Sequence, residues 1–259
     1  MNIAAMQWES VGEYRTAVEL CEKLRDRDVT LPTEVVDALG RVEALAARRP
    51  EPPAADLVST LYAAGVGDAE INAAATDRAI AKEKLSGWSA AHNVAGRGLR
   101  KALFAACDDL TDQLGALAEP LIDDLHTVAE SGHGPADLPA LIRDGRKDLI
   151  ERIARLDLSA LGLRALYDLR AMLTPPDAGY AVGLIDCGIW VDPRPVRNAF
   201  SGGRPDGQAE FYLAGIRAGG RLWFPRHQEA AAAAMAIHQA EEKKKPKRQE
   251  VSRGGVAFT

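Results

Sequence analysis

Cys187 and His227 are the residues whose types come nearest to a catalytic pair. A cysteine thiol becomes a nucleophile when an imidazole takes its proton, and Asp186 stands beside this cysteine. Their separation in the fold is not fixed by the sequence, however, and one cysteine with one histidine is a common coincidence. The chain also lacks the phosphate-binding, zinc-protease, serine-nucleophile and dinucleotide motifs of familiar enzymes. We therefore expect no catalytic residues, no cofactor and no enzymatic activity.

Acidic residues crowd the outer face of one predicted helix and raise the question of a metal site. They are Asp108, Asp109, Asp112, Glu119, Asp123 and Asp124, with His126 nearby. Adjacent residues do not share a helical face, however, and the Glu-x-x-His spacing of helical metal sites is absent. The pattern is typical of a solvated acidic face, and we expect no bound metal.

Basic residues concentrate near the C-terminus of a chain whose formal net charge is −5. Guanidinium groups bind carboxylates and phosphates through paired hydrogen bonds, so this region is the natural place for an anionic partner or a neighbouring subunit. The candidate binding residues are Arg194, Arg197, Arg204, Arg217, Arg221, Lys243, Lys244 and Lys245. We expect Arg194, Arg197 and Arg204 to project from a long loop over residues 192–207.

Residues 57–78 have the pattern of a helix, a tight turn at Gly65 and a second helix. A DNA-binding helix-turn-helix has the same spacing, but its recognition helix presents its first residues to DNA. Here those residues include Asp68 and Glu70, which would be repelled by phosphates and instead suit the positive end of a helix dipole. The segment is therefore interpreted as two ordinary packed helices.

Apolar residues recur at helical spacing through the first two-thirds of the chain. A capping box at Ser10–Glu13 predicts a first helix, and Pro32 begins a second. A longer stripe advances by about 3.6 residues per step, which predicts an ordinary α-helix and not a supercoiled one. We expect Pro120 to kink this helix. This stripe consists of Leu99, Leu103, Cys107, Leu110, Leu114, Leu117, Leu121, Leu125 and Val128. Shorter helices are expected over 141–156 and 159–173, with Ile150, Ile153, Leu161, Leu166 and Leu169 in the core.

The composition changes after residue 176. Residues 177–225 contain Tyr180, Trp190, Phe200, Phe211, Tyr212, Trp223 and Phe224, which are half of the aromatic residues. Short aromatic and β-branched runs at 180–185, 188–191, 209–216 and 221–224 predict strands, with a hairpin turn at 218–220. The expected fold class is mainly α, with a helical bundle and a small C-terminal antiparallel β module, or α+β overall.

Proline-rich stretches suggest the domain boundaries. They predict a helical arm over 1–49, a helical bundle over 54–174, the β module over 177–225, and a terminal helix with a basic tail over 226–259. The three cysteines are far apart and predict buried, reduced thiols. We see no signal peptide and no stretch able to span a membrane, so we expect a soluble protein in the cytoplasm, or in a virion if it is phage-encoded.

Two functions remain open on the sequence alone. The first is a non-enzymatic structural or assembly subunit of a multi-copy complex, by architectural analogy a bacteriophage virion protein, which would form a homo-oligomer or larger assembly. The second is a regulatory protein that binds nucleic acid through the arginine-rich module and the basic tail. The expected partners are other protein subunits or nucleic acid, and not a membrane.

Overall fold

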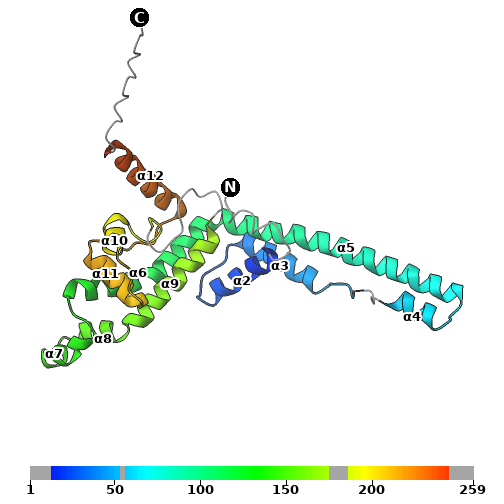
Figure 1. The fold of residues 1–259 in the computed structure, drawn as a ribbon, viewed down its shortest axis with the longest axis horizontal. Coiled ribbons are helices and arrows are strands. Elements are labelled where there is room, and N and C mark those ends of the chain that lie inside the picture. Colours follow the sequence, from blue (N-terminus) through cyan, green and yellow to red (C-terminus); the bar gives the residue numbers. More distant parts are fainter. Residues whose placement is uncertain (1–12, 53–55, 175–185, 245–259) are drawn as a thin grey trace, which may run out of the picture. The chain divides into compact units, whose positions relative to one another are not determined.

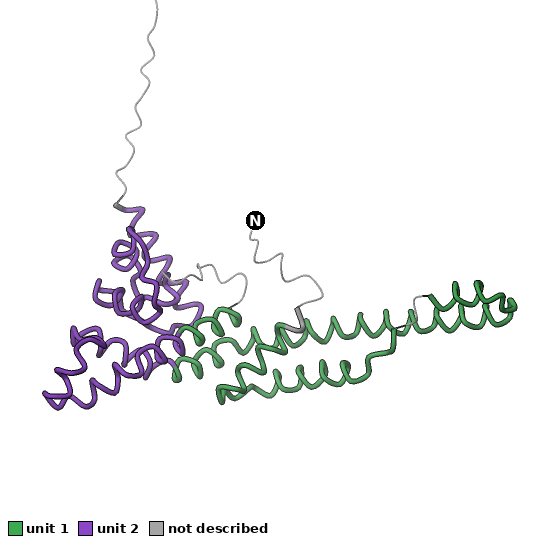
Figure 2. Tube along the Cα trace, turned by 60° about the horizontal axis from the view of Figure 1, so that its bottom comes forward, with its two compact units in different colours: residues 1–117, 164–177 green, residues 118–163, 178–259 purple. Residues whose placement is uncertain are grey.

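The computed structural model describes residues 13–52, 56–174 and 186–244. Helices make up most of this part of the chain (Figure 1). The chain divides into two compact units: unit 1 comprises residues 1–117 and 164–177, and unit 2 comprises residues 118–163 and 178–259 (Figure 2). The boundaries between the units fall inside two helices, α6 (Cys107–Ser131) and α9 (Leu156–Leu173).

Unit 1 is organised around the long helix α5 (Asp68–Ala105). The helices α2 (Glu13–Arg25), α3 (Thr33–Ala46) and α4 (Leu57–Ala63) all pack against it, as Figure 1 shows. The core of this unit includes the predicted apolar faces of α2 and α3, where Cys21, Leu24, Val35, Leu39 and Val42 are buried. The capping box at Ser10–Glu13 lies partly outside the described residues.

Side-chain hydrogen bonds fasten α3 and its approach to the rest of unit 1. The indole Nε1 of Trp88 on α5 donates to the Leu45 carbonyl near the end of α3 at 2.7 Å. The amide of Gln113 pairs with the backbone of Thr30: Oε1 accepts from the Thr30 N–H at 2.8 Å, and Nε2 donates to the Thr30 carbonyl at 3.0 Å. Backbone groups that no helix satisfies thus find partners in neighbouring elements.

The helix–turn–helix pattern at 57–78 is present as α4 and the start of α5. Gly65 has a φ of +69°, a left-handed conformation that glycine adopts readily after a helix. Asp68 and Glu70 occupy the first turn of α5, and Ile71 is buried.

The long stripe that begins at Leu99 belongs to two helices instead of one. Helix α5 ends at Ala105, and α6 begins at Cys107 and continues through Pro120. The stripe is buried as far as Leu114, but Leu117 is 41% exposed and Ala118 is buried in its place. Each residue turns the helix by about 100°. Ala118, four residues after Leu114, therefore lies closer to the face that continues to Leu125 than Leu117 does.

In unit 2, η1 (Pro135–Asp137), α7 (Leu138–Arg143) and α8 (Lys147–Ala154) replace the single helix expected over 141–156. Gly145 separates α7 from α8 with a φ of +70°. The helix expected over 159–173 is α9, which begins earlier, at Leu156. Along this stretch Leu161 is 59% exposed, contrary to its predicted core position, whereas Leu163 is buried.

The predicted C-terminal β module is wrong. Among the described residues there is one isolated antiparallel bridge, between Trp190 and Leu222, and no sheet. Residues 209–216, expected as a strand, lie in helix α11 (Gln208–Arg217), and the expected long loop contains helix α10 (Arg194–Ala199). The expected strand at 180–185 lies outside the described residues. The chain is mainly helical.

Close packing around Trp190 explains why residues 209–216 form a helix. Trp190 is fully buried and contacts the rings of Phe211 and Tyr212, which are adjacent in sequence and both buried. A strand would send adjacent side chains to opposite faces, whereas a helix places both beside one tryptophan. A Cβ atom on Gly215 would lie 2.5 Å from Trp190 Cη2, so the indole also requires a glycine there. Tertiary packing overrides the strand propensity of the aromatic residues.

The expected hairpin turn at 218–220 is the end of α11. Gly219 has a φ of +94°, and the Gly220 N–H donates to the Gly215 carbonyl at 2.9 Å. This left-handed residue closes the helix in the manner of a glycine C-cap. The last described helix, α12 (His227–Lys244), follows. In the described part of the chain, no helix has both the length and the apolar content needed to cross a bilayer.

Candidate functional site

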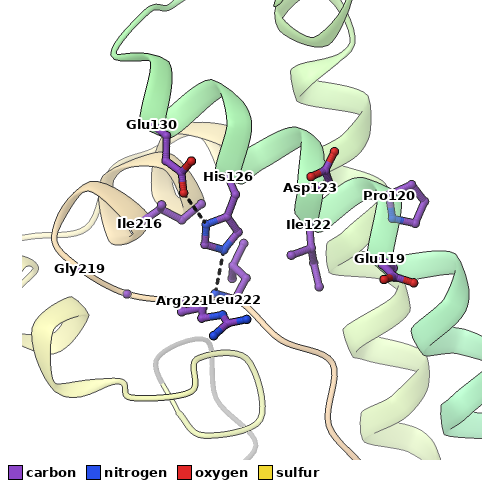
Figure 3. A pocket seen from close by; sticks show the side chains of 11 residues that line it. Glu119, Pro120, Ile122, Asp123, His126, Glu130, Ile216, Gly219, Arg221 and Leu222 are labelled. Atoms are coloured by element: carbon purple, nitrogen blue, oxygen red, sulfur yellow. Dashed lines mark hydrogen bonds and ion pairs between the residues drawn. The ribbon is translucent and has the colours of Figure 1, made fainter.

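An open pocket of about 890 Å³ lies in unit 2 (Figure 3). One wall is a face of α6 and the other is the end of α11 with the segment that follows it. The residues that line the pocket are Glu119, Pro120, Ile122, Asp123, His126, Glu130, Ile216, Gly219, Gly220, Arg221 and Leu222.

His126 is the central polar residue of this pocket. Its Nε2 accepts a hydrogen bond from the Leu222 N–H at 3.2 Å, which requires a neutral ring with the proton on Nδ1. Nδ1 lies 3.9 Å from a carboxylate oxygen of Glu130, too far for a hydrogen bond. Burial lowers the pKa of His126 below 6.5, against the opposing charge of Glu130. The imidazole therefore anchors the segment beside the isolated bridge.

Three carboxylates share the α6 face with His126, at a spacing of four, three and four residues: Glu119, Asp123 and Glu130. A metal site needs converging ligand atoms, but these side chains do not bring three of them within 4.8 Å of one another in the described structure. Asp123 is also engaged by Arg152 Nη1 at 2.6 Å. The pocket is suited to a cationic or hydrogen-bonding group of a partner, and its lining contains no cysteine, serine or lysine nucleophile.

Asp124 corrects the prediction of a wholly solvated acidic face. Its side chain is only 5% exposed, and it accepts hydrogen bonds from Arg152 at 2.9 Å, from Arg155 at 2.7 and 2.8 Å, and from Ser159 at 3.1 Å. Burial alone would raise the pKa of Asp124, but the hydrogen bonds from Arg155 and Ser159 and the two arginine charges outweigh it and lower the pKa below 3.8. This cluster joins α6 to α8 and α9.

The sequence contained a weak signal for this cluster. Arg152, Arg155 and Ser159 are spaced by three and four residues, so on continuous helix they would share a face. The signal was insufficient for two reasons. First, α8 and α9 are separate helices, so the three residues do not lie on one continuous helix. Second, nothing in the sequence indicates that these residues contact Asp124 and not its exposed neighbour Asp123.

The predicted binding arginines have different environments. Arg194 forms a two-pronged ion pair with Asp192, with contacts of 2.9 Å at Nε and 2.6 Å at Nη2. This pairing lowers the pKa of Asp192. Arg197 is exposed on α10. Because Arg194 and Arg197 belong to a helix, they do not project from a long loop.

The remaining predicted cations are spread over several elements of unit 2. The Arg204 guanidinium lies 4.3 Å from the centre of the Phe211 ring, a cation–π arrangement. Arg217 donates to the His133 carbonyl at 3.3 Å, and Arg221 lines the His126 pocket. Lys243 is exposed on α12, the helix also contains Lys244, and Lys245 lies outside the described residues.

Cys187 does not have the environment of an activated nucleophile. It is buried, and this burial, together with the Asp186 charge, raises the pKa of its thiol. Catalytic cysteines require the opposite shift. Cys21 and Cys107 form no disulfide and are likewise buried, and burial raises the pKa of each thiol to about 11.

Helix α5 has an uncovered apolar surface that none of the sequence-based expectations included. Its outward side chains include Ala69, Ala73, Ile80, Ala91 and Val94, which we call the outer face of α5; all are exposed. Ile80 is 48% exposed and Val94 60% exposed. A helical face that is exposed to water normally carries charged and polar residues. The signal was the alanine-rich sequence of 69–98, whose helical spacing leaves a second apolar stripe opposite the buried one.

Comparisons of the chain with protein-family models, with curated proteins and with solved structures find no match.

Proposed function

We propose that this chain is a non-enzymatic assembly subunit that binds neighbouring protein subunits through uncovered helical surfaces. The observation that carries the proposal is the outer face of α5. Between Ile71 and His92 no side chain of α5 is buried, although many of these residues are apolar. Apolar side chains grouped on an exposed helical face are typical of an interaction site.

Helix α4 strengthens the proposal because it covers α5 poorly. None of its residues is buried; Tyr62 is 64% exposed and Leu57 is 41% exposed. Most helical stability in proteins comes from packing of an apolar face, and short helices are marginal by themselves in water. A partner that covered α4 and the adjoining part of α5 would supply this packing, and tyrosine is among the residues enriched in binding hot spots.

Such a subunit would act in the cytoplasm, or in a virion if it is phage-encoded. The competing proposal, a nucleic-acid-binding regulator, would use the exposed cations of unit 2. It is less favoured because Arg194 is neutralised by Asp192 and because the net charge of the chain is −5.

Sedimentation analysis over a range of concentrations tests the two proposals directly. We expect a species heavier than the 27.8 kDa single chain that persists in about 1 M salt, because apolar contacts are not screened. The change Ile80→Glu should weaken assembly, whereas Leu158→Glu, at a position 73% exposed on α9, serves as the control. A single-chain mass at every concentration would contradict assembly. DNA binding that falls steeply with salt would favour the regulator.

A further inference from the structure

A groove of about 670 Å³ runs between α3 and α5 within unit 1. Its floor on α5 is made of small or apolar residues, Ala91, Val94, Ala95, Gly98 and Ala102. A Cβ atom on Gly98 would meet nothing within 4 Å, so the groove is open there. Small floor residues allow the backbone of another helix to approach closely, and an apolar groove of this kind receives amphipathic helices in many complexes.

The walls of the groove are held in place before any partner binds. The Trp88 indole donates to the Leu45 carbonyl at 2.7 Å, and the Arg49 guanidinium lies 5.5 Å from the centre of the same indole. These contacts fasten the end of α3 to α5. A groove formed in advance reduces the conformational entropy lost on binding.

Acidic residues dominate the α3 rim of the groove. Glu34 and Asp37 are exposed there beside a single cation, Arg41. The occupant best suited to this groove is therefore a helix with a small, apolar contact face and basic residues near one end.

Helix α12 of this same chain has that chemistry. Of residues 227–243, only Ala230 is buried. Ala232, Met235, Ala236 and Gln239 are exposed on one face, with Met235 61% exposed, and Lys243 follows one turn after Gln239 on the same side. The basic sequence continues with Lys244, Lys245, Lys247 and Arg248, which outnumber Glu241 and Glu242.

The lengths of the two surfaces also agree. The groove floor extends from residue 91 to residue 102, and the exposed face of α12 extends from residue 232 to residue 243. Each interval corresponds to about 16 Å of helix, at about 1.5 Å per residue.

We propose that the α3–α5 groove of one copy binds α12 of a second copy. Met235 contacts the floor around Val94, and the lysines at the end of α12 approach Glu34 and Asp37. This inference rests on the proposed function, because it names the partner in assembly as the same chain. Since the two surfaces differ, the contact is head-to-tail and continues into rings or open arrays.

Cross-linking between two differently sized versions of the chain tests this contact. One version carries Val94→Cys and the other Met235→Cys; the native cysteines are buried and give little background. With a short bis-maleimide reagent we expect a mixed cross-linked dimer. The matched control replaces Val94→Cys with Leu158→Cys, which is more exposed but lies outside the groove and should give little mixed dimer.

A charge exchange tests the proposed orientation. Glu34→Lys with Asp37→Lys, or Lys243→Glu with Lys244→Glu, should each weaken assembly by about tenfold at low salt, as expected for opposed charges at the rim of an interface. A mixture of the two variants should recover assembly, because the signs are again complementary. Failure of the mixture to recover while each variant is impaired would overturn the proposed pairing.

The outcomes separate this inference from the proposed function. A heavy, salt-tolerant species without the Val94–Met235 cross-link leaves assembly standing and overturns the groove contact. A single-chain mass at all concentrations overturns both. A third outcome concerns a chain that carries both Val94→Cys and Met235→Cys. If it cross-links only within itself, at high dilution and at high concentration, the occupant of the groove is not a second copy. Mixed dimer formation with recovery by charge exchange supports the inference.

Discussion

Asp124 is the residue whose charge contributes most clearly to the fold of unit 2. Its buried carboxylate accepts hydrogen bonds from two arginines and a serine. Asp124→Asn keeps the shape but removes the charge and replaces one acceptor oxygen with a donor that faces guanidinium groups. We expect a loss of about 1–3 kcal/mol in the free energy of unfolding, measured by urea denaturation at neutral pH.

Asp123→Asn provides the control for that measurement. Its carboxylate also contacts Arg152, but it is 62% exposed, so solvent weakens the interaction. The expected loss is at most about 1 kcal/mol. Equal losses for the two variants would contradict a special role for the buried carboxylate.

His126 makes the stability of unit 2 depend on pH. Burial lowers its folded-state pKa below the usual 6.5. The neutral ring also accepts the Leu222 N–H, a hydrogen bond that the protonated ring cannot accept. The unfolded state therefore takes up a proton first as the pH falls. The contribution of neutral His126 to the free energy of unfolding is fully present above about pH 6.5. It is lost as the pH falls toward and through the lowered folded pKa.

His126→Gln tests this pH dependence, since an amide oxygen can still accept from Leu222 but does not titrate. The decline in unfolding free energy between about pH 7.5 and pH 5.5 should be smaller in this variant than in the wild type. His238→Gln changes an exposed histidine and should leave the decline unaltered. Burial also lowers the pKa of His92, so a residual decline in His126→Gln is expected. An unchanged decline would remove His126 from the explanation.

At the scale of elements, helix α11 depends on its contact with Trp190. Gly215→Ala would place a Cβ atom 2.5 Å from the indole, which must then shift within a fully buried cluster. We expect a loss of about 1–3 kcal/mol in stability and an altered near-ultraviolet circular dichroism signal from the aromatic cluster.

Gly40→Ala on α3 is the matched change in an open position. A Cβ atom there meets nothing within 4 Å, so alanine should stabilise the helix by about 0.5–1 kcal/mol. A loss at Gly40 as large as that at Gly215 would mean that the indole contact does not decide the outcome.

At the scale of the whole molecule, the N-terminal helices belong to unit 1 through packing even though a proline-rich segment follows them. Arg48 and Arg49 are exposed at the end of α3, and Pro50 follows. Trypsin should therefore cut after Arg48 under native conditions. The two fragments should remain together on gel filtration, because α2 and α3 pack on α5.

As the control, the native digest is passed over the same gel-filtration column in about 6 M urea, where the two fragments should separate. Separation without denaturant would show that residues 13–46 form an independent arm, as the predicted domain boundaries imply. Complete resistance at Arg48 would show that the segment before Pro50 is protected.

Local sequence patterns were enough to predict the main helices and turns of unit 1. Apolar spacing located α2, α3 and the buried stripe from Leu99 to Leu114, and Gly65 located the turn before α5. These features follow from interactions between residues close in sequence, namely the periodicity of a helical face and the conformational freedom of glycine.

Contacts between distant residues set the conformation of 209–216, the environment of Asp124 and the α3–α5 groove. The aromatic residues of 209–216 favour a strand in isolation, but burial of Phe211 and Tyr212 against Trp190 requires a helix. Asp123 and Asp124 are indistinguishable in sequence, yet only Asp124 meets Arg155 and Ser159. The groove between α3 and α5 likewise depends on segments about fifty residues apart. Such contacts arise between distant residues, so their energies enter only when the chain has folded.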